Sequence, residues 1–202
     1  MNIIKIEPCA VNAGTGCRVV LWVAGCPHHC EGCHNPETWN YNQGHKVEVS
    51  PKDWKKDPLL KQMYELLQKP YIQGLTITGG EPLSECNMKI LLYMCLDLKN
   101  DPKTKTKDIW VWTGYKYEDI INYHILKFID VLVDGEFEIN KRDITLPFRG
   151  SSNQRVIRLN SYKPLVLIDS LTKDKGSPVW QPLVIKQRPE EEFDKLVAAF
   201  FL

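Results

Sequence analysis

Four short runs of almost wholly apolar residues constrain the fold more than any other feature of this sequence. The runs are Arg18 to Ala24, Gly74 to Thr78, Asp108 to Thr113 and Ile129 to Asp134. Each is too short for a helix, and its β-branched and aromatic content favours a strand buried on both faces. Segments with helical spacing of apolar residues lie between the runs. The sequence therefore predicts βαβ units and an α/β fold with a parallel sheet.

Three helices are expected between these strands. Pro58 can start the first, Ser84 can cap the second, and the third is predicted from Tyr117 to Phe128. The polar segment from Asn40 to Lys56 is expected to be a loop.

The alternation of strands and helices fades from Asn160 onward. This part predicts two strands around a turn at Asp174 to Pro178, and a short amphipathic helix that starts at Pro189. We therefore expect a core domain at residues 1–159 and a C-terminal extension at residues 160–202 that packs on the core.

The charge balance excludes some classes of partner. The chain has 202 residues, with 26 Lys and Arg against 25 Asp and Glu, for a net charge of +1. Neither nucleic acid nor an anionic membrane is expected as a partner of such a chain. No apolar run reaches the roughly 18 residues of a membrane span, and the N-terminus lacks the long apolar run of a signal peptide. The sequence therefore favours the cytoplasm, where clustered cysteines more often indicate metal or redox chemistry than disulfides.

The stretch "GCPHHCEGC" places Cys26, Cys30 and Cys33 in a C-x3-C-x2-C spacing directly after the first predicted strand. In a parallel α/β fold, the loops at the carboxyl ends of the strands build the functional sites. Three thiolates on one loop can hold three corners of a cubane iron–sulfur cluster, which usually has four cysteine ligands. A missing fourth ligand leaves one iron open to bind a substrate.

The same three cysteines could also bind zinc or remain free thiols. A zinc site would need a fourth ligand, which His28, His29, His34 or His45 could supply. Zinc ligands usually come as two spaced pairs, however, and no second pair is visible, so the spacing favours a cluster over zinc or free thiols. The remaining cysteines are expected to be small buried apolar residues: Cys9, Cys17, Cys86 and Cys95.

A second motif, "TITGGEPL", begins in the next predicted strand. Gly79 and Gly80 could let a ligand approach the backbone, or could simply serve a tight connection from strand to helix. Glu81 can accept hydrogen bonds from an ammonium group, and Pro82 fixes the turn.

The two motifs together resemble the radical S-adenosylmethionine enzymes. "CPHHCEGC" is similar to their cluster motif, and "GGEP" to the segment that binds the amino group of S-adenosylmethionine. Many members carry an aromatic residue just before the third cysteine, where this chain has Gly32. The subfamily that activates anaerobic ribonucleotide reductase has glycine there, and "NAGTGCRVV", "CHNPETWN", "WVWTGY" and "FRGSSNQRVI" also resemble that subfamily.

The resemblance implies a truncated, partial parallel β/α barrel, because about 250 residues are usual for the full form. It implies one [4Fe–4S] cluster on Cys26, Cys30 and Cys33, with S-adenosylmethionine on the open iron. The implied cofactor-binding residues are Thr78, Gly79, Gly80, Glu81, Pro82, Thr113 and Asp134. The implied partners are the large subunit of anaerobic ribonucleotide reductase, as protein substrate, and a low-potential electron donor such as a flavodoxin or ferredoxin.

Several roles remain alternatives. The chain could activate another glycyl radical enzyme, act on a small molecule by radical chemistry, or be a non-catalytic iron–sulfur or zinc protein. Trp39 could shield the cluster or belong to the core. A polar group beside the predicted strand "RVIRL", residues 155–159, could contact a cofactor or partner, or form a solvated turn before that strand: Arg149, Asn153, Gln154 and Arg155.

Overall fold

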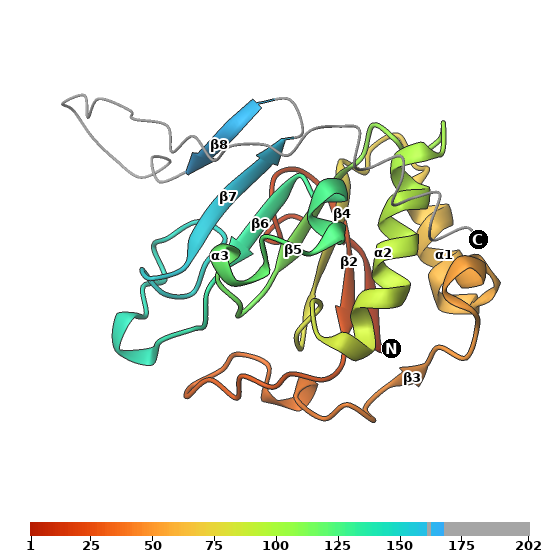
Figure 1. The fold of residues 1–202 in the computed structure, drawn as a ribbon. Coiled ribbons are helices and arrows are strands. Elements are labelled where there is room, and N and C mark those ends of the chain that lie inside the picture. The colour runs from red at the N-terminus through yellow and green to blue at the C-terminus, as the bar shows by residue number, and fades with distance from the viewer. Residues whose placement is uncertain (161–162, 168–202) are drawn as a thin grey trace.

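The computed structural model describes residues 1–160 and 163–167, and its strands form one eight-stranded sheet with the order β3-β1-β2-β4-β5-β6-β7-β8 (Figure 1). The strands are β1 (Asn2–Ala10), β2 (Arg18–Val23), β3 (His45–Lys46), β4 (Gly74–Gly79), β5 (Asp108–Trp112), β6 (Val131–Asp134), β7 (Arg155–Asn160) and β8 (Lys163–Leu167). Helices α1 (Pro58–Leu67) and α2 (Glu85–Asn100) are seen to the right of the central strands in Figure 1, and both contribute buried side chains to the core that covers these strands.

The centre of the sheet is parallel, as the sequence predicts. Strands β2, β4, β5 and β6 pair in parallel in that order, and all four predicted apolar runs form them. The side chains of Val19, Leu21, Leu75 and Ile77 are 0% exposed, because helices or further side chains cover both faces. The α/β class with a parallel core is confirmed, and the sheet has the open form of a partial barrel, with β3 and β8 at its two ends.

Antiparallel strands extend this core on both sides. Strand β1 pairs with β2 and β3, and β7 pairs with β6 and β8. The apolar pattern of the sequence does not predict β1, because Lys5 and Glu7 interrupt its apolar residues. These two side chains form an exposed ion pair on the outer part of the sheet.

Two of the predicted helices are confirmed, but their N-terminal capping contacts differ from those expected. Helix α1 begins at Pro58, and the carboxylate of Asp57 accepts hydrogen bonds from the first free backbone N–H groups, so Asp57 is the cap. Ser84 stands at the N-cap of α2 as predicted, but its hydroxyl accepts from the Asn87 side chain at 3.1 Å rather than capping the backbone.

The third predicted helix is wrong over part of its length. The segment forms a short helix, α3 (Tyr117–Ile120), and a separate 3-10 helix, η3 (His124–Phe128). Tyr123 between them has an extended backbone, with ψ of 122°. The break still buries Ile120 and Ile125, each 1% exposed, so the apolar spacing identifies the buried residues but not the continuity of the helix.

The expectation of a loop from Asn40 to Lys56 is also wrong in part. This segment contains β3 and a 3-10 helix, η2 (Pro51–Lys56). Trp54 in η2 is 0% exposed, and its indole N–H donates to the carboxylate of Asp97 at 2.9 Å. One buried aromatic side chain therefore anchors a segment whose composition is polar.

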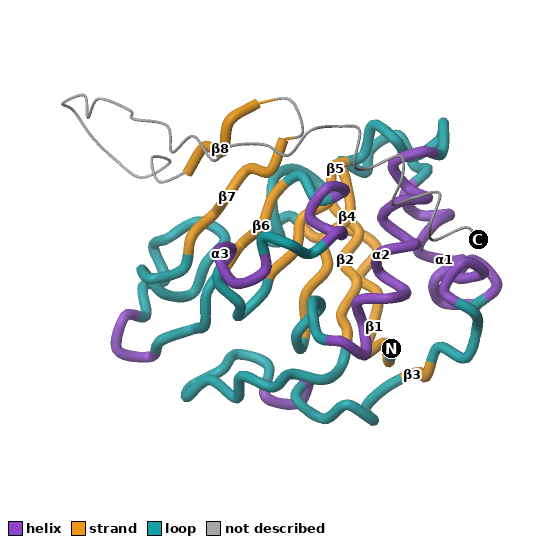
Figure 2. Tube along the Cα trace, in the orientation of Figure 1, coloured by secondary structure: helices purple, strands orange, loops and turns teal. Residues whose placement is uncertain are grey.

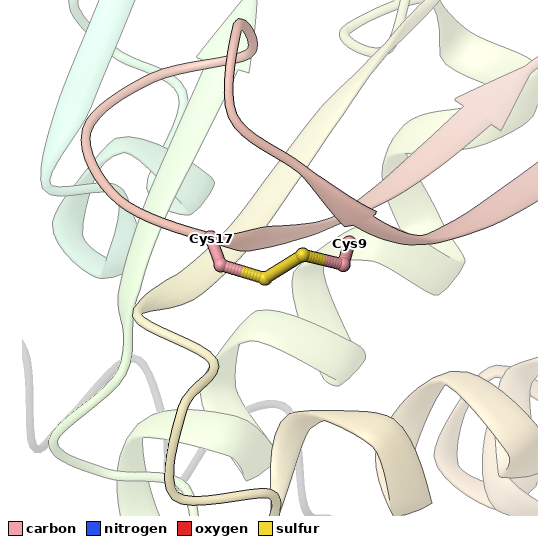
Figure 3. Close-up of a disulfide and its surroundings, with 2 residues drawn as sticks. All are labelled: Cys9 and Cys17. Carbon is pink, nitrogen blue, oxygen red and sulfur yellow. A yellow bond between two sulfur atoms is a disulfide. The ribbon is translucent and has the colours of Figure 1, made fainter.

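A disulfide joins Cys9 and Cys17 across the turn from β1 to β2 (Figure 3). The prediction that these two cysteines are buried apolar residues is wrong, since Cys9 is exposed and Cys17 is partly exposed. Cys86 is exposed as well, whereas Cys95 is buried as predicted. Cys9 lies near the end of β1 and Cys17 directly precedes β2, whereas Cys26 follows the other end of β2.

The predicted turn at Asp174 to Pro178 and the helix from Pro189 lie outside the described residues. Within residues 1–160 and 163–167, no helix combines the length and the apolar character that crossing a membrane requires.

Candidate functional site

The three clustered cysteines lie on the connection that follows β2. In Figures 1 and 2 this connection crosses the lower edge of the sheet, mostly as loop, where β2 ends. Cys26 is 9% exposed, Cys30 and Cys33 are partly exposed, and all three are free thiols. The backbone N–H of Cys26 donates to the carbonyl oxygen of Trp39 at 3.2 Å. This hydrogen bond joins the start of the loop to its end, and Cys30 and Cys33 lie on the segment between them.

Burial makes these thiols weak acids. It raises the pKa of Cys26 to about 11 and also raises the pKa of Cys30. The carboxylates of Glu81 and Glu136 act in the same direction on Cys26 and Cys30 respectively. Because the thiolate is the form that binds metal, a metal centre bound here must displace these protons.

Within the described residues, no three His, Cys, Asp or Glu side chains converge on a position that could hold a single metal ion. In a cubane cluster, each thiolate binds a different iron atom, so its ligands need not converge on one point. Three free thiols spread along one loop therefore fit a cluster better than a mononuclear zinc site.

Gly32 departs from the aromatic residue that many similar motifs carry, and its surroundings explain the departure. Its φ is 71°, a left-handed conformation that side chains rarely adopt. A Cβ at this position would lie 2.8 Å from the Cδ1 atom of Ile139. The side chain of Ile139 thus fills the space beside the third cysteine.

The Gly–Gly–Glu–Pro turn packs directly on the start of the cysteine loop. The backbone N–H of Glu81 donates to the carbonyl oxygen of Gly25 at 2.7 Å. A Cβ on Gly80 would collide with that same carbonyl oxygen, and Gly79 ends β4 with a φ of 108°. The two glycines thus allow this turn to approach the end of β2 and the cysteine loop closely, and their role in binding a cofactor stays a prediction.

The carboxylate of Glu81 is buried at 0% exposure and accepts four hydrogen bonds. One oxygen accepts from the backbone N–H of Leu83 at 2.8 Å and from the hydroxyl of Thr113 at 2.9 Å. The other accepts from the backbone N–H of Gly114 at 2.8 Å and lies 2.9 Å from Nε2 of His28. The structure thus brings together two of the predicted site residues, Glu81 and Thr113.

His28 is a site residue that the sequence indicates only as a possible zinc ligand. Its Nε2 faces Glu81, and its Nδ1 lies 3.1 Å from the carboxylate of Glu136. The hydrogen bond with Glu81, above all, raises the pKa of His28. A carboxylate thus lies within hydrogen-bond distance of each ring nitrogen of His28. The one signal in the sequence was its place between two of the clustered cysteines.

Three further predicted site residues make no hydrogen bond with the Glu81 carboxylate in the described structure: Thr78, Pro82 and Asp134. Thr78 is partly exposed near the end of β4, and Pro82 is buried in the turn. Asp134 is 1% exposed at the end of β6, where its carboxylate accepts from the guanidinium of Arg155 and from the backbone N–H of Tyr117. The carboxylate of Asp134 therefore already has partners within the protein.

The polar group before β7 ties together the loops next to this site. The side-chain amide of Gln154 bonds to the backbone of Gly135, Gly150 and Ser151, and Asn153 donates to the carbonyl oxygen of Glu136 at 2.8 Å. These contacts hold the connection that carries Glu136. The solvated turn that the sequence allows is thus a hydrogen-bonded support of the site.

A cavity of about 610 Å³ adjoins the cysteine loop and the Gly–Gly–Glu–Pro turn. Its volume lies within the usual range for sites that bind small molecules, about 300–1,000 Å³. Four separate parts of the chain line it, through Pro27, Tyr41, Ser84, Glu85, Cys86 and Tyr115. Neither Tyr41 nor Cys86 is predicted there from the sequence, because no local pattern connects them.

Comparison with known protein families agrees with this geometry. A family described as "4Fe-4S single cluster domain" matches residues 12–157, which include the cysteine loop, the Gly–Gly–Glu–Pro turn and the strands between β2 and β6. The fold and the three free cysteines thus define a protein of the class that carries one [4Fe–4S] cluster.

Similar proteins narrow this class. Over 156 residues, 77% of this chain and 93% of the relative, the chain is 44% identical to the anaerobic ribonucleoside-triphosphate reductase-activating protein of Enterobacteria phage T4. The proteins of the same name from Pasteurella multocida and Escherichia coli K12 are 38% and 35% identical, over 80% and 79% of this chain and 100% and 99% of their own lengths. The chain belongs to the family of anaerobic ribonucleoside-triphosphate reductase-activating proteins.

Proposed function

We propose that this protein activates an anaerobic ribonucleoside-triphosphate reductase by generating a glycyl radical on it. One observation carries the proposal. Three free cysteines and the buried Glu81 carboxylate lie on adjoining loops at one edge of a parallel sheet, in a chain of the activating-protein family. The substrate is then a protein, and its target is a backbone glycine.

The residues present fit a [4Fe–4S] cluster. Cys26, Cys30 and Cys33 would hold it, and no fourth cysteine accompanies them on the loop. The indole N–H of Trp39 is buried without a hydrogen-bond partner in the described structure. The backbone carbonyl oxygen of Trp39 accepts a hydrogen bond from the N–H of Cys26, the first of the three cysteines. The sulfur atoms of a cluster accept hydrogen bonds, so a cluster would supply acceptors beside an otherwise unpaired donor.

S-adenosylmethionine is the second proposed cofactor. When bound, the cluster and S-adenosylmethionine together supply the one-electron chemistry that breaks a carbon–sulfur bond and removes a hydrogen atom from the substrate. Glu81 would bind the amino group of S-adenosylmethionine, and Thr113 holds the Glu81 carboxylate in place at 2.9 Å. The turn of Gly79, Gly80 and Pro82 fixes Glu81 next to the cysteine loop.

Two further residues keep their proposed roles in the cofactor wall. Thr78 near the end of β4 would face the cofactor, and Asp134 would support it from the end of β6. The pairing of Asp134 with Arg155 at 2.9 Å favours support of the strand end over direct contact. Tyr41 and Tyr115 on the cavity would exclude water from the reacting groups.

The proposed partners follow from the same chemistry. A flexible glycine-containing loop of the reductase would enter the cavity, and the bound partner would close the site against water. A low-potential donor such as a flavodoxin or ferredoxin would supply the electron, in the cytoplasm. Residues 1–159 form the proposed radical domain, and residues 160–202 are proposed as an extension that packs on it.

Electron paramagnetic resonance tests the function directly. The reduced, cluster-loaded protein is mixed with S-adenosylmethionine and its cognate reductase without oxygen. The expected result is a glycyl doublet, which disappears when the target glycine of the reductase is changed to alanine. Cleavage of S-adenosylmethionine without a radical on any cognate reductase would contradict the proposal.

A further inference from the structure

His28 occupies the last acceptor position on the Glu81 carboxylate. An ionised carboxylate offers about four lone-pair sites. Glu81 already uses four donors: the backbone N–H groups of Leu83 and Gly114, the hydroxyl of Thr113, and Nε2 of His28. A further donor, such as the amino group of a ligand, can bind to Glu81 only if one of these four leaves.

Three of the four donors are fixed by the fold. Leu83 and Gly114 donate through their backbones. Thr113 is 5% exposed, and its hydroxyl also accepts from the backbone N–H of Tyr115 at 3.2 Å. Removing any of them from Glu81 would require the end of β5 or the start of α2 to move.

The fourth donor is different, because it lies at the end of a side chain that can rotate. The ring of His28 contacts Tyr115 edge-on, with 4.7 Å between the ring centres. The ring also packs against Gly114: its Cδ2 atom lies 2.5 Å from the position that a Cβ on Gly114 would take. Pro27 before it and Tyr115 beside it both line the cavity. A ligand that enters the cavity therefore meets the His28 contact at its border.

Glu136 gives the displaced ring a second partner. Its carboxylate lies 3.1 Å from Nδ1 of His28, and its own side chain is 57% exposed and able to follow the ring. The backbone at Glu136 is held by Asn153. His28 can thus leave Glu81 without losing every hydrogen bond, which lowers the free-energy cost of its displacement.

We propose that His28 holds the amino-group position on Glu81 in the unliganded protein and is displaced from it when S-adenosylmethionine binds, while its contact with Glu136 remains. The inference rests on the proposed function, since it takes the ligand of Glu81 to be the amino group of S-adenosylmethionine. His28 is then a positioning residue that occupies the acceptor position on Glu81 when the site holds no ligand, and so lowers ligand affinity.

Binding of S-adenosylmethionine to the cluster-loaded protein, measured by calorimetry without oxygen and without reductant, tests this inference. His28→Ala frees the acceptor position and is expected to tighten binding several-fold. His34→Ala is the matched control, because His34 is an exposed histidine next to Cys33. Its affinity is expected to equal that of the wild type. Weaker or unchanged binding by a folded, iron-replete His28→Ala variant would overturn the inference.

Crystal structures of the wild-type, cluster-loaded protein with and without S-adenosylmethionine provide a second test that needs no variant. The expected pair shows Nε2 of His28 on Glu81 without the ligand, and the amino group in its place with the ligand. A His28–Glu81 hydrogen bond that persists in the complex overturns the inference and leaves the proposed function standing. Wild-type protein that binds no S-adenosylmethionine would instead contradict the proposed function itself.

Discussion

The side-chain amide of Asn87 donates a hydrogen bond of 3.0 Å to the carbonyl oxygen of Ala24, the residue that links β2 to the cysteine loop. The same amide donates to the carbonyl oxygen of Glu81 at 3.0 Å. Asn87 is 0% exposed in the first turn of α2. One side chain thus joins three parts of the site: the cysteine loop, the turn that carries Glu81, and the helix behind them.

The first prediction follows from this contact. Asn87→Ala removes the side-chain donor of the carbonyl oxygen of Ala24 and one of the two donors of the carbonyl oxygen of Glu81, which keeps the N–H of Ser84 at 3.2 Å. It is expected to lower the free energy of unfolding by about 1–3 kcal/mol. Urea denaturation measures the change. Asn100→Ala is the control, because Asn100 lies at the exposed end of the same helix and its side-chain amide donates to the carbonyl oxygen of Leu96 in that helix. Equal losses in the two variants would show that the amide of Asn87 does not join these segments.

The second prediction concerns Gly80. Gly80→Ala places a Cβ against the carbonyl oxygens of Gly25 and Thr38, so the cysteine loop must move. Overpacking of this kind costs about 1–3 kcal/mol, and we expect lower stability together with a lower iron content after reconstitution. Full stability and full iron content, with a loss only of S-adenosylmethionine binding, would show instead that Gly80 serves the approach of the ligand.

The third prediction concerns the cluster ligands. Cys30→Ala is expected to lose most of the iron and all cleavage of S-adenosylmethionine, because a cluster with three protein ligands has none to spare. Cys86→Ala is the control, since Cys86 is also a free, accessible thiol beside the site. Iron and sulfide analysis after anaerobic reconstitution compares the two. Loss of iron as complete in Cys86→Ala as in Cys30→Ala would contradict the ligand assignment.

Much of the centre of the fold was predictable, because buried parallel strands leave a direct trace in the sequence. The runs that became β2, β4, β5 and β6 are apolar on both faces, so each can be recognised without knowledge of its neighbours. Strand β1 alternates apolar residues with Lys5 and Glu7 and gives no such run. Its position depends on pairing with β2, which is a tertiary interaction.

The site was predictable only where its residues lie within one motif. Cys26, Cys30 and Cys33 are close in sequence, and their spacing carries the chemistry. The contact of His28 with Glu136 spans 108 residues, and no local pattern indicates it. The bond between Cys9 and Cys17 was not predicted, because the antiparallel pairing of β1 with β2 brings the two cysteines together, and β1 itself was not predicted.

A fourth prediction concerns the ion pair between Arg18 and Asp108, at the edge of the sheet where the parallel strands β2 and β5 begin. The guanidinium of Arg18 is 0% exposed, and it bonds to the carboxylate of Asp108 at 2.7 Å. Burial lowers the pKa of Arg18, and Asp108 opposes that shift. Asp108→Ala leaves a buried cation without its carboxylate and is expected to cost about 3 kcal/mol of unfolding free energy.

The exposed pair of Lys5 and Glu7 gives the matched control for Asp108. Its side chains are 51% and 36% exposed, so Glu7→Ala is expected to cost less than about 1 kcal/mol. Urea denaturation under the same conditions measures the loss of unfolding free energy in Asp108→Ala and in Glu7→Ala. A similar cost in both would show that Asp108 does not compensate a buried charge.

The last prediction concerns the disulfide between Cys9 and Cys17. Its two cysteines are eight residues apart in sequence. Closing so short a loop restricts the unfolded chain and stabilises the folded protein by about 2–3 kcal/mol. A phosphine reductant is therefore expected to lower the unfolding free energy of the wild type by this amount.

Cys9→Ser should show the lower unfolding free energy without reductant and should not respond to the reductant. Cys86→Ser, which removes a free thiol, should respond as the wild type does. If the wild type does not respond, or if Cys9→Ser responds equally, the disulfide does not contribute to stability.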